Sequence, residues 1–262
     1  MLPFFELTFL GSRLTISSYN LLMGIGIVSG MLVLQKTCKR LKIPNTQADN
    51  LWVMVAASLL TGLISAVLIN KVYHYENSRN FLSHLTKYTG MTFEGGLVGG
   101  AITFVLMYKR LNKGFRGIMN LLNCITPSIV IGHFFGRVGC FLAGCCFGKP
   151  TSSPIGIVFP EKSLAAQYYG EGIRVVPVQL MEAVFLAILF LMLSNLLLNH
   201  SFSAYLISYG IFRFLIEYLR GDDRGILFQT VFSPSQCMSI VLVMTGAFVL
   251  LRIATYAYGT GD

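Results

Sequence analysis

The chain has 262 residues, of which 54% are hydrophobic and only 12% are charged, and its mean hydropathy is +0.67. A soluble core of this size cannot hide so much apolar surface, so the composition excludes a soluble globular protein and indicates an integral membrane protein. The formal net charge of +9 comes from basic residues that flank apolar segments, without a separate basic helix or patch, which speaks against nucleic-acid binding. We interpret this charge as contact with anionic lipid headgroups.

Seven apolar segments approach the length of about 20 residues that a helix needs to cross a bilayer. They lie at about 19–34, 51–70, 93–108, 118–135, 177–198, 204–219 and 234–251. The sequence therefore predicts an all-α integral membrane protein with seven transmembrane helices, which form a single transmembrane domain over residues 1–262. Residues 1–17 lack the pattern of a cleavable signal peptide, and we expect them to lie along the outer interface as an amphipathic arm.

Two basic clusters indicate the orientation of these helices. They consist of Lys36, Lys39, Arg40 and Lys42 after the first segment, and of Lys109, Arg110, Lys113 and Arg116 after the third. Because cytoplasmic loops are enriched in Lys and Arg, both clusters are predicted to be cytoplasmic. Seven helices then place the N-terminus outside and the C-terminus in the cytoplasm. The region at about 147–176 is too polar to span the membrane, and we expect it to form an outer lid or small head.

The first three segments contain few candidates for a site. Tyr19 opens the first segment and is either a site residue or a member of the aromatic belt. His74 and His84 lie ten residues apart with no further ligand nearby, so we expect no metal there. Glu94 lies in the stretch MTFEGGLVGG. A carboxylate in an apolar helix is costly to bury unless it is paired or protonated, so we interpret Glu94 as a site residue, with a wetted interfacial glutamate as the alternative.

The stretch GHFFGRVGCFLAGCCFGKPT at 132–151 follows the fourth segment, where that segment is predicted to reach water. Its glycines are expected to permit tight turns and close approach of the backbone. They are Gly136, Gly139, Gly144 and Gly148. Arg137 is a planar, permanently charged group that suits phosphate or carboxylate, and the alternative is an anchor that snorkels to the headgroups. His133, one turn earlier, is either a packing residue or part of the same site.

The same stretch contains Cys140, Cys145 and Cys146. A vicinal pair with one cysteine five residues earlier lacks the C-x-x-C spacing of zinc sites, and no second ligand pair follows, so we expect neither a metal nor another cofactor. We favour packing or a disulfide on the outer side of the membrane. The alternative is a reactive thiol whose pKa is lowered by Arg137.

Charged residues also lie inside the fifth and sixth segments. Gln179 and Glu182 are three residues apart and share a helical face, and Glu182 needs a partner, for which we expect an arginine from another helix. Arg213, Glu217 and Arg220 recur at i, i+4 and i+7, so they are predicted to face the bundle or a polar cavity. The alternative is a self-contained pair of Arg213 and Glu217. A solvated turn is expected to follow, formed by Asp222, Asp223 and Arg224.

Taken together, these motifs resemble the prolipoprotein diacylglyceryl transferase family. The motifs are F-x-G-G-L-x-G in the third segment, GRVGCFLAGCCFG after the fourth, P-x-Q-L-x-E in the fifth and YGIFRFLIEYLRGD in the sixth, and the resemblance is collinear from about Tyr19 to Gln236. It implies a seven-helix enzyme of the bacterial inner membrane. Such an enzyme transfers diacylglycerol from phosphatidylglycerol to the thiol of a lipobox cysteine in a prolipoprotein and releases glycerol phosphate.

The resemblance also implies roles for the candidate residues. We expect Arg137 and Arg213 to bind the phosphate, Glu94 to act as the general base, and Glu217 to hold an arginine in place. The predicted substrate-binding residues are Tyr19, Gly139, Cys140, Gln179, Glu182 and Arg220.

The chain departs from the family pattern at several positions. Glu94 stands where the family usually has histidine, and Val176 stands where histidine often precedes the proline. Cys140 and Cys145 replace an asparagine and a glutamate, and Ala143 replaces a second asparagine. These departures indicate a divergent, cysteine-rich branch of the family.

Other functions remain open at this point. A lipid or anionic-solute transporter also uses intramembrane arginines and broken helices, although no inverted repeat is evident in the sequence. A binding protein that has lost the chemistry, or a lipid transferase with a different acceptor, also fits the motifs. The products formed from phosphatidylglycerol and a lipobox peptide distinguish these functions.

Overall fold

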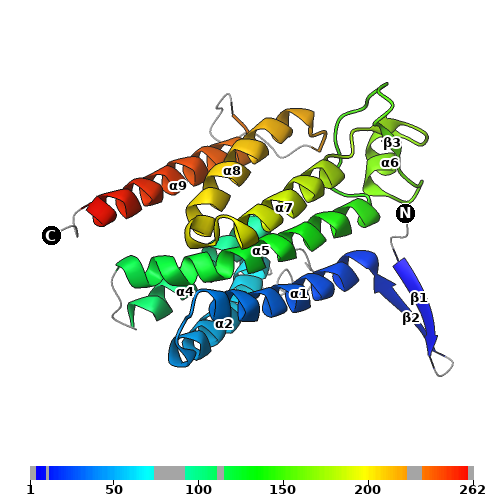
Figure 1. The fold of residues 1–262 in the computed structure, drawn as a ribbon. Coiled ribbons are helices and arrows are strands. Elements are labelled where there is room, and N and C mark those ends of the chain that lie inside the picture. The colour runs from blue at the N-terminus through cyan, green and yellow to red at the C-terminus, as the bar shows by residue number, and fades with distance from the viewer. Residues whose placement is uncertain (1–3, 10–11, 74–91, 111–114, 223–231, 259–262) are drawn as a thin grey trace. The chain divides into compact units, whose positions relative to one another are not determined.

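The computed structural model describes residues 4–9, 12–73, 92–110, 115–222 and 232–258. The described elements are mostly helices, together with two small antiparallel sheets of two strands each (Figure 1). The chain divides into two compact units. Unit 1 comprises Met1–Leu41 and Leu122–Asp262, and unit 2 comprises Lys42–Leu121.

Unit 2 is built on a pair of helices, α2 (Asn45–Tyr73) and α4 (Phe93–Lys109). Small residues line their contact and let the two backbones approach closely, which is a common way for helices to associate in lipid. A Cβ atom placed on Gly62 would lie 2.9 Å from the carbonyl oxygen of Gly96. The glycines of the MTFEGGLVGG stretch therefore serve the packing of α4 against α2.

Unit 1 contains most of the remaining long helices. They are α1 (Ser18–Arg40), α5 (Phe115–Ala143, whose first residues belong to unit 2), α7 (Val178–Asn195), α8 (Ser201–Ile216) and α9 (Pro234–Tyr258), with the short 3-10 helices η1 (Leu198–His200) and η2 (Glu217–Leu219). A buried cluster that includes Val130, Leu186, Leu193 and Tyr209 joins α5, α7 and α8. This cluster holds together the helices that carry the candidate site.

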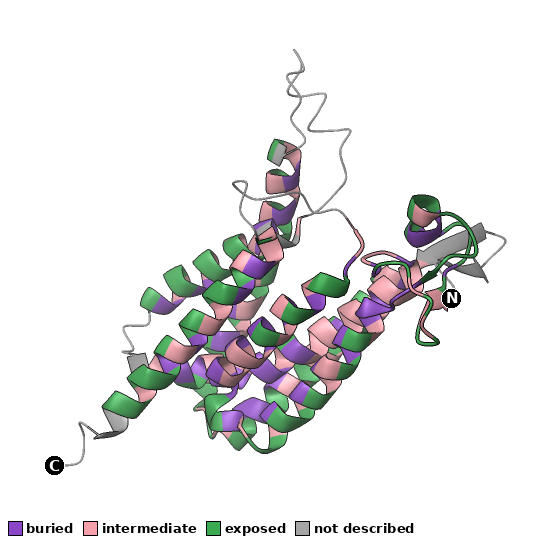
Figure 2. Ribbon diagram, turned by 90° about the horizontal axis from the view of Figure 1, so that it is seen from above, coloured by how far each residue is buried: buried purple, intermediate pink, exposed green. Residues whose placement is uncertain are grey.

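Many residues of the long helices are exposed (Figure 2), and they include large apolar side chains such as Leu32 at 64% and Met244 at 67%. Contact with lipid accounts for so much exposed apolar surface. In the described part of the chain, five helices are long and apolar enough to cross a membrane. The helices α4 and α8 are shorter, at 17 and 16 residues. The structure thus supports a multi-pass helical membrane protein, but length and composition alone do not give the predicted seven spans.

The N-terminal arm differs from the prediction. Strands β1 (Phe4–Phe9) and β2 (Ser12–Ser17) pair antiparallel, with Phe4 opposite Ser17 and Phe9 opposite Ser12. The sequence SRLTIS of β2 alternates polar and apolar residues, and this two-residue period is typical of a strand. The all-α prediction overlooked this period, so it missed the hairpin.

The glycine-rich stretch also differs from the prediction. Helix α5 continues to Ala143, so Gly136, Arg137 and Gly139 lie inside the helix and not in a loop beyond it. The helix ends at Gly144, whose φ of +69° favours glycine, and whose N–H donates to the carbonyl of Phe141 at 3.1 Å. Of the tight turns expected in this stretch, the one at Gly144 is present.

Residues 144–177 form a small head that follows α5. It contains strands β3 (Ile157–Val158) and β4 (Arg174–Val175), which pair antiparallel, and the short helix α6 (Leu164–Tyr169). Its buried cluster consists of Phe147, Phe159, Ala165 and Val175, with Phe141 of α5 and Tyr169 packed against it. The polar region between the fourth and fifth predicted helices is therefore an ordered head rather than an unstructured loop.

Gly148 joins this head to the segment after η2. Its N–H donates to the carbonyl of Val176 at 3.0 Å, and it forms an antiparallel bridge with Arg220. A Cβ atom at this position would lie 2.5 Å from the carbonyl oxygen of Val176 and 2.8 Å from that of Leu219. Both obstacles are backbone atoms, so neither can move aside as a flexible side chain can.

We therefore expect Gly148→Ala to destabilise the protein by about 1–3 kcal/mol, the range found for overpacked sites. The measurement is thermal unfolding of the detergent-solubilised protein. Gly24→Ala is the matched control, because a Cβ atom on Gly24 in α1 meets no atom within 4 Å and alanine favours a helix. Equal unfolding midpoints for Gly148→Ala and the wild type would show that the junction tolerates a side chain.

Candidate active site

The candidate site lies in unit 1, where the end of α5, the start of α7, and the end of α8 meet (Figure 1). Each helix presents its polar residues at helical spacing, so that they lie on one face. Helix α5 contributes His133 and Arg137, α7 contributes Gln179 and Glu182, and α8 with η2 contributes Tyr205, Tyr209, Arg213 and Glu217.

Glu182 is the centre of this network. It is 1% exposed, and its Oε1 lies 2.9 Å from Arg137 Nε. The hydroxyl of Tyr209 donates to the same oxygen at 2.8 Å, and His133 Nε2 lies 3.5 Å from it. A carboxylate buried this deeply needs a charged partner and hydrogen bonds to remain ionised. The prediction that an arginine from another helix pairs with Glu182 is confirmed.

The geometry of this pair leaves part of the Arg137 guanidinium for another ligand. The contact with Glu182 uses Nε, at the base of the guanidinium group. The two terminal nitrogens form the planar fork that binds carboxylate or phosphate in a bidentate manner. His133 packs edge-on against Tyr209, with ring centroids 5.0 Å apart, and its Nε2 lies 3.4 Å from Arg137 Nε. The network therefore restricts the orientation of Arg137.

A second arginine is held by α8, η2 and the start of α9. Arg213 is 6% exposed, and its Nη1 lies 2.6 Å from Glu217 Oε2. Its Nη2 donates to Ser235 Oγ at 2.9 Å, and Ser233 Oγ donates to Glu217 Oε1 at 2.8 Å. The pair of Arg213 and Glu217 considered above does form, but it is also tied to α9. The charged face points into the bundle, as predicted.

Arg137 and Arg213 both lie near Glu182. Glu182 interacts electrostatically with Arg137 and also with Arg213. His133 likewise interacts with both guanidinium groups. Guanidinium groups from α5 and α8 therefore both lie near one buried carboxylate.

Arg220 has a partner that the sequence prediction missed. Its Nε donates to Asp222 Oδ1 at 2.9 Å and its Nη2 donates to Oδ2 at 2.7 Å, while Glu217 Oε2 lies 3.8 Å away. The expectation of a solvated turn is thus corrected in part for Asp222, whose side chain is 23% exposed but pairs with the buried Arg220. The next two residues of that turn, 223 and 224, lie outside the described residues.

Other predicted substrate-binding residues lie on α1, α5 and α7, and Tyr19 lies near Arg137. Tyr19 packs against Gly139, where a Cβ atom would lie 3.1 Å from the tyrosine ring, and Tyr19 interacts electrostatically with Arg137 and with Cys140. Gln179 is 1% exposed, and its Nε2 donates to the carbonyl of Cys145 at 2.6 Å. Three other residues considered in the sequence lie outside what the structure describes, namely the side chain of Glu94 and the whole of His74 and His84.

The thiols after α5 also lie beside the arginines. The pKa of the Cys146 thiol is lowered, first by hydrogen bonds with the thiols of Cys140 and Cys145 and then by the nearby guanidinium groups of Arg220 and Arg137. Hydrogen bonds with the thiols of Cys140 and Cys146 raise the pKa of the Cys145 thiol. Cys146 is therefore the thiol that ionises most readily outside the membrane-spanning helices.

Two residues of the network, Tyr205 and Tyr209, were not predicted as site residues, and for His133 the sequence left packing and a role in the site open. The hydroxyl of Tyr205 lies 3.5 Å from His133 Nδ1, and its ring stacks on Tyr209. Tyr205 and Tyr209 continue the stripe of Arg213 and Glu217 backwards in steps of four residues. Following that stripe toward the N-terminus would have found both of them.

The fold and the site together define a multi-pass membrane protein that holds buried arginine–carboxylate pairs between its helices. A family model described as prolipoprotein diacylglyceryl transferase matches residues 7–252, and the chain belongs to this family.

Relatives with the name phosphatidylglycerol–prolipoprotein diacylglyceryl transferase match most of the chain. The protein of that name from Clostridium tetani is 31% identical over 90% of this chain and 92% of its own length. The transferase 2 of Clostridium perfringens is 30% identical over 89% of both chains. The protein from Rickettsia africae is 29% identical over 91% of this chain and 93% of its own length.

Proposed function

We propose that this chain transfers the diacylglyceryl group of phosphatidylglycerol to the thiol of a prolipoprotein lipobox cysteine. Family membership and the names of the relatives support this function. The observation that carries it is the placement of Arg137 and Arg213 near the same buried carboxylate, Glu182, because the reaction has to stabilise a departing phosphate.

In this reaction, the thiolate attacks the glycerol carbon that carries the phosphate. A carbon–sulfur bond forms, the carbon–oxygen bond to the phosphate breaks, and glycerol phosphate leaves with the bonding electrons. Negative charge grows on the phosphate ester oxygen as this bond breaks. We assign the guanidinium fork of Arg137 and the remaining N–H groups of Arg213 to that charge, since bidentate contacts are strongest where water is scarce.

The carboxylates and Tyr209 act as positioning residues in this proposal. Glu182 holds Arg137 by its Nε, and Tyr209 holds Glu182. Glu217 and Ser235 hold the terminal nitrogens of Arg213. Arginines held in this way need little reorganisation when charge develops, which is the main benefit of a preorganised site.

The thiol proton goes to a general base, which the sequence assigns to Glu94. A carboxylate of ordinary pKa is a weak base for a thiol whose pKa is about 8.5, so this role requires burial that raises the pKa of Glu94. Replacement of Glu94 by glutamine separates a structural role of this residue from its role as the base. Glutamine has nearly the same size, but it cannot accept the thiol proton.

An apolar groove on α7 and α8 supports a lipid substrate. Its volume is about 500 Å³, and its lining residues are Leu180, Met181, Val184, Phe185, Ile188 and Phe212. Met181 and Phe185 are neighbours of Glu182 on α7. We assign this groove to an acyl chain of phosphatidylglycerol whose headgroup lies at the arginines.

We further propose a seven-span topology in the bacterial inner membrane, with the N-terminus outside and the C-terminus in the cytoplasm. Lys39 and Arg40 at the end of α1, and Lys109 at the end of α4, then lie on the cytoplasmic side. Helix α8 has 16 residues and a length of about 24 Å at 1.5 Å per residue, so it needs η2 to approach the thickness of the hydrocarbon core. The head and the arginine site lie on the outer side in this topology.

The test uses the full-length protein in phosphatidylglycerol vesicles with a peptide that contains one lipobox cysteine. We expect a thioether-linked diacylglyceryl peptide by mass spectrometry and an equal amount of glycerol phosphate. A peptide with serine in place of the cysteine is the matched control. Movement of lipid between leaflets without product would indicate a transporter, and bound lipid without product would indicate a binding protein. Either of these results would overturn the proposal.

A further inference from the structure

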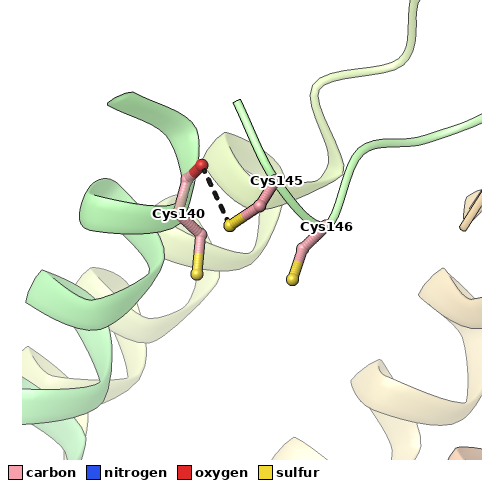
Figure 3. A group of neighbouring side chains, drawn as sticks. All are labelled: Cys140, Cys145 and Cys146. Atoms are coloured by element: carbon pink, nitrogen blue, oxygen red, sulfur yellow. Dashed lines mark hydrogen bonds between the residues drawn. The ribbon is translucent and has the colours of Figure 1, made fainter. Parts of the chain in front are cut away.

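The turn after α5 gathers thiols that the sequence spacing does not group as metal ligands. Cys140 lies in the last turn of α5, and Cys145 and Cys146 follow Gly144. The sulfur atoms of Cys140, Cys145 and Cys146 all lie within 4.8 Å of one another. Figure 3 shows them together beside the end of the helix, and none of them forms a disulfide. We call these residues the thiol cluster.

The backbone holds the cluster in this arrangement. The chain reverses at Gly144, and the N–H of Cys145 returns to the carbonyl of Cys140 at 3.1 Å. Gln179 of α7 fixes the carbonyl of Cys145 through its 2.6 Å hydrogen bond. Cys146 adopts a φ of +59°, which is unusual for a residue with a side chain and persists only where its surroundings determine it. The turn thus brings together three thiols whose C-x₄-C-C spacing in the sequence does not by itself indicate a metal site.

The charges around the cluster favour an anionic group. Cys146 interacts electrostatically with Arg220 and Arg137, and Cys140 interacts with Arg137 as well. Three thiolates around one divalent cation carry a net charge of −1, which these guanidinium groups stabilise. The same guanidinium groups disfavour a bare cation, so the surroundings select a metal held by fully deprotonated thiols.

We propose that the thiol cluster is a binding site for one thiophilic cation, with Zn²⁺ held by the sulfur atoms of Cys140, Cys145 and Cys146. Thiolates are the preferred ligands of such soft or borderline ions. Zinc–sulfur bonds of about 2.3 Å in tetrahedral geometry place sulfur atoms about 3.8 Å apart, so the cluster closes by about 1 Å on binding. Binding releases the thiol protons to solvent and leaves the fourth position open to water.

The test measures zinc directly on the full-length protein in detergent. The protein is reduced, treated with a chelator and titrated with Zn²⁺ in competition with a chromophoric chelator. We expect one Zn²⁺ per chain, and we expect Cys140→Ser, Cys145→Ser and Cys146→Ser each to weaken binding by about 100-fold or more, because each removes one of the metal's ligands. Cys237→Ser in α9 is the matched control and should bind as the wild type does. Substitution of Co²⁺ should give a thiolate-to-metal charge-transfer band that the Cys146→Ser variant loses.

A second measurement uses the wild-type protein, so it does not require that the serine variants fold. Bound Zn²⁺ should protect the three clustered thiols from alkylation by a maleimide, as mapped by mass spectrometry, while Cys237 should react at the same rate with and without zinc. The proposal is overturned if the wild type binds no stoichiometric zinc, or if the serine variants bind it equally well. It is also overturned if the protein purified without reductant contains a disulfide within the cluster and no metal. These readouts do not use the transfer reaction, so they separate this proposal from the proposed function.

Discussion

Replacing Arg137 and Glu182 together by glutamine is expected to restore the stability that either single replacement loses, without restoring diacylglyceryl transfer. Each single replacement leaves a buried charge without its partner, which typically costs about 3–5 kcal/mol. In Arg137→Gln/Glu182→Gln both charges are absent, and Tyr209 retains an acceptor at position 182 for the hydrogen bond now seen at 2.8 Å. The guanidinium fork is still missing, so we expect turnover to fall by about 100- to 1000-fold.

The measurements are the thermal unfolding midpoint in detergent and the rate of thioether formation, for both single variants and the double variant. Arg174→Gln is the control, since Arg174 is an exposed arginine in the head. If the double variant transfers diacylglycerol at a rate near that of the wild type, Arg137 does not bind the phosphate. If the single variants are as stable as the wild type, the pair does not hold the helices as the 2.9 Å contact indicates.

Helical periodicity explains what the sequence could predict about this site. A charged residue on an apolar helix has to face a partner, so Glu182 and the stripe of Arg213, Glu217 and Arg220 could be assigned to the interior before their partners were known. The same argument predicted an arginine from another helix as the partner of Glu182, and the structure identifies it as Arg137. Periodicity does not say which partner each residue chooses.

Tertiary contacts decided the features that the sequence did not predict. Asp222 looked like part of a solvated turn, but the bridge between Gly148 and Arg220 draws this segment under the head. The end of α5 was placed too early, since glycine is a weak helix former in isolation and Gly139 is stabilised in the helix by the ring of Tyr19. The thiol cluster was also missed. The C-x-x-C spacing rule for metal ligands applies to one type of turn, so it does not recognise cysteines that a different turn brings together.

Arg213→Lys should abolish most of the transfer activity even though it keeps the positive charge. Arg213 Nη1 forms an ion pair with Glu217 at 2.6 Å, and its Nη2 donates a hydrogen bond to Ser235 at 2.9 Å. A lysine ammonium carries its charge on one nitrogen and lacks the planar fork that reaches these two partners through separate nitrogens while it contacts a phosphate oxygen. We therefore expect turnover to fall by about 100-fold, close to the loss for Arg213→Ala. Arg252→Lys is the control, because Arg252 lies exposed on α9 over the ring of Phe248.

Separate values of kcat and KM distinguish a clamp from a structural residue. If Arg213 binds the phosphate mainly as charge develops, Arg213→Lys lowers kcat and leaves KM for phosphatidylglycerol almost unchanged. If Arg213 only supports the contact between α8 and α9, Ser235→Ala should reproduce the effect, since it removes the hydrogen bond that joins these helices. Near-normal turnover in Arg213→Lys would show that charge alone suffices at this position, and the assignment of the Arg213 guanidinium N–H groups to the leaving phosphate would be wrong.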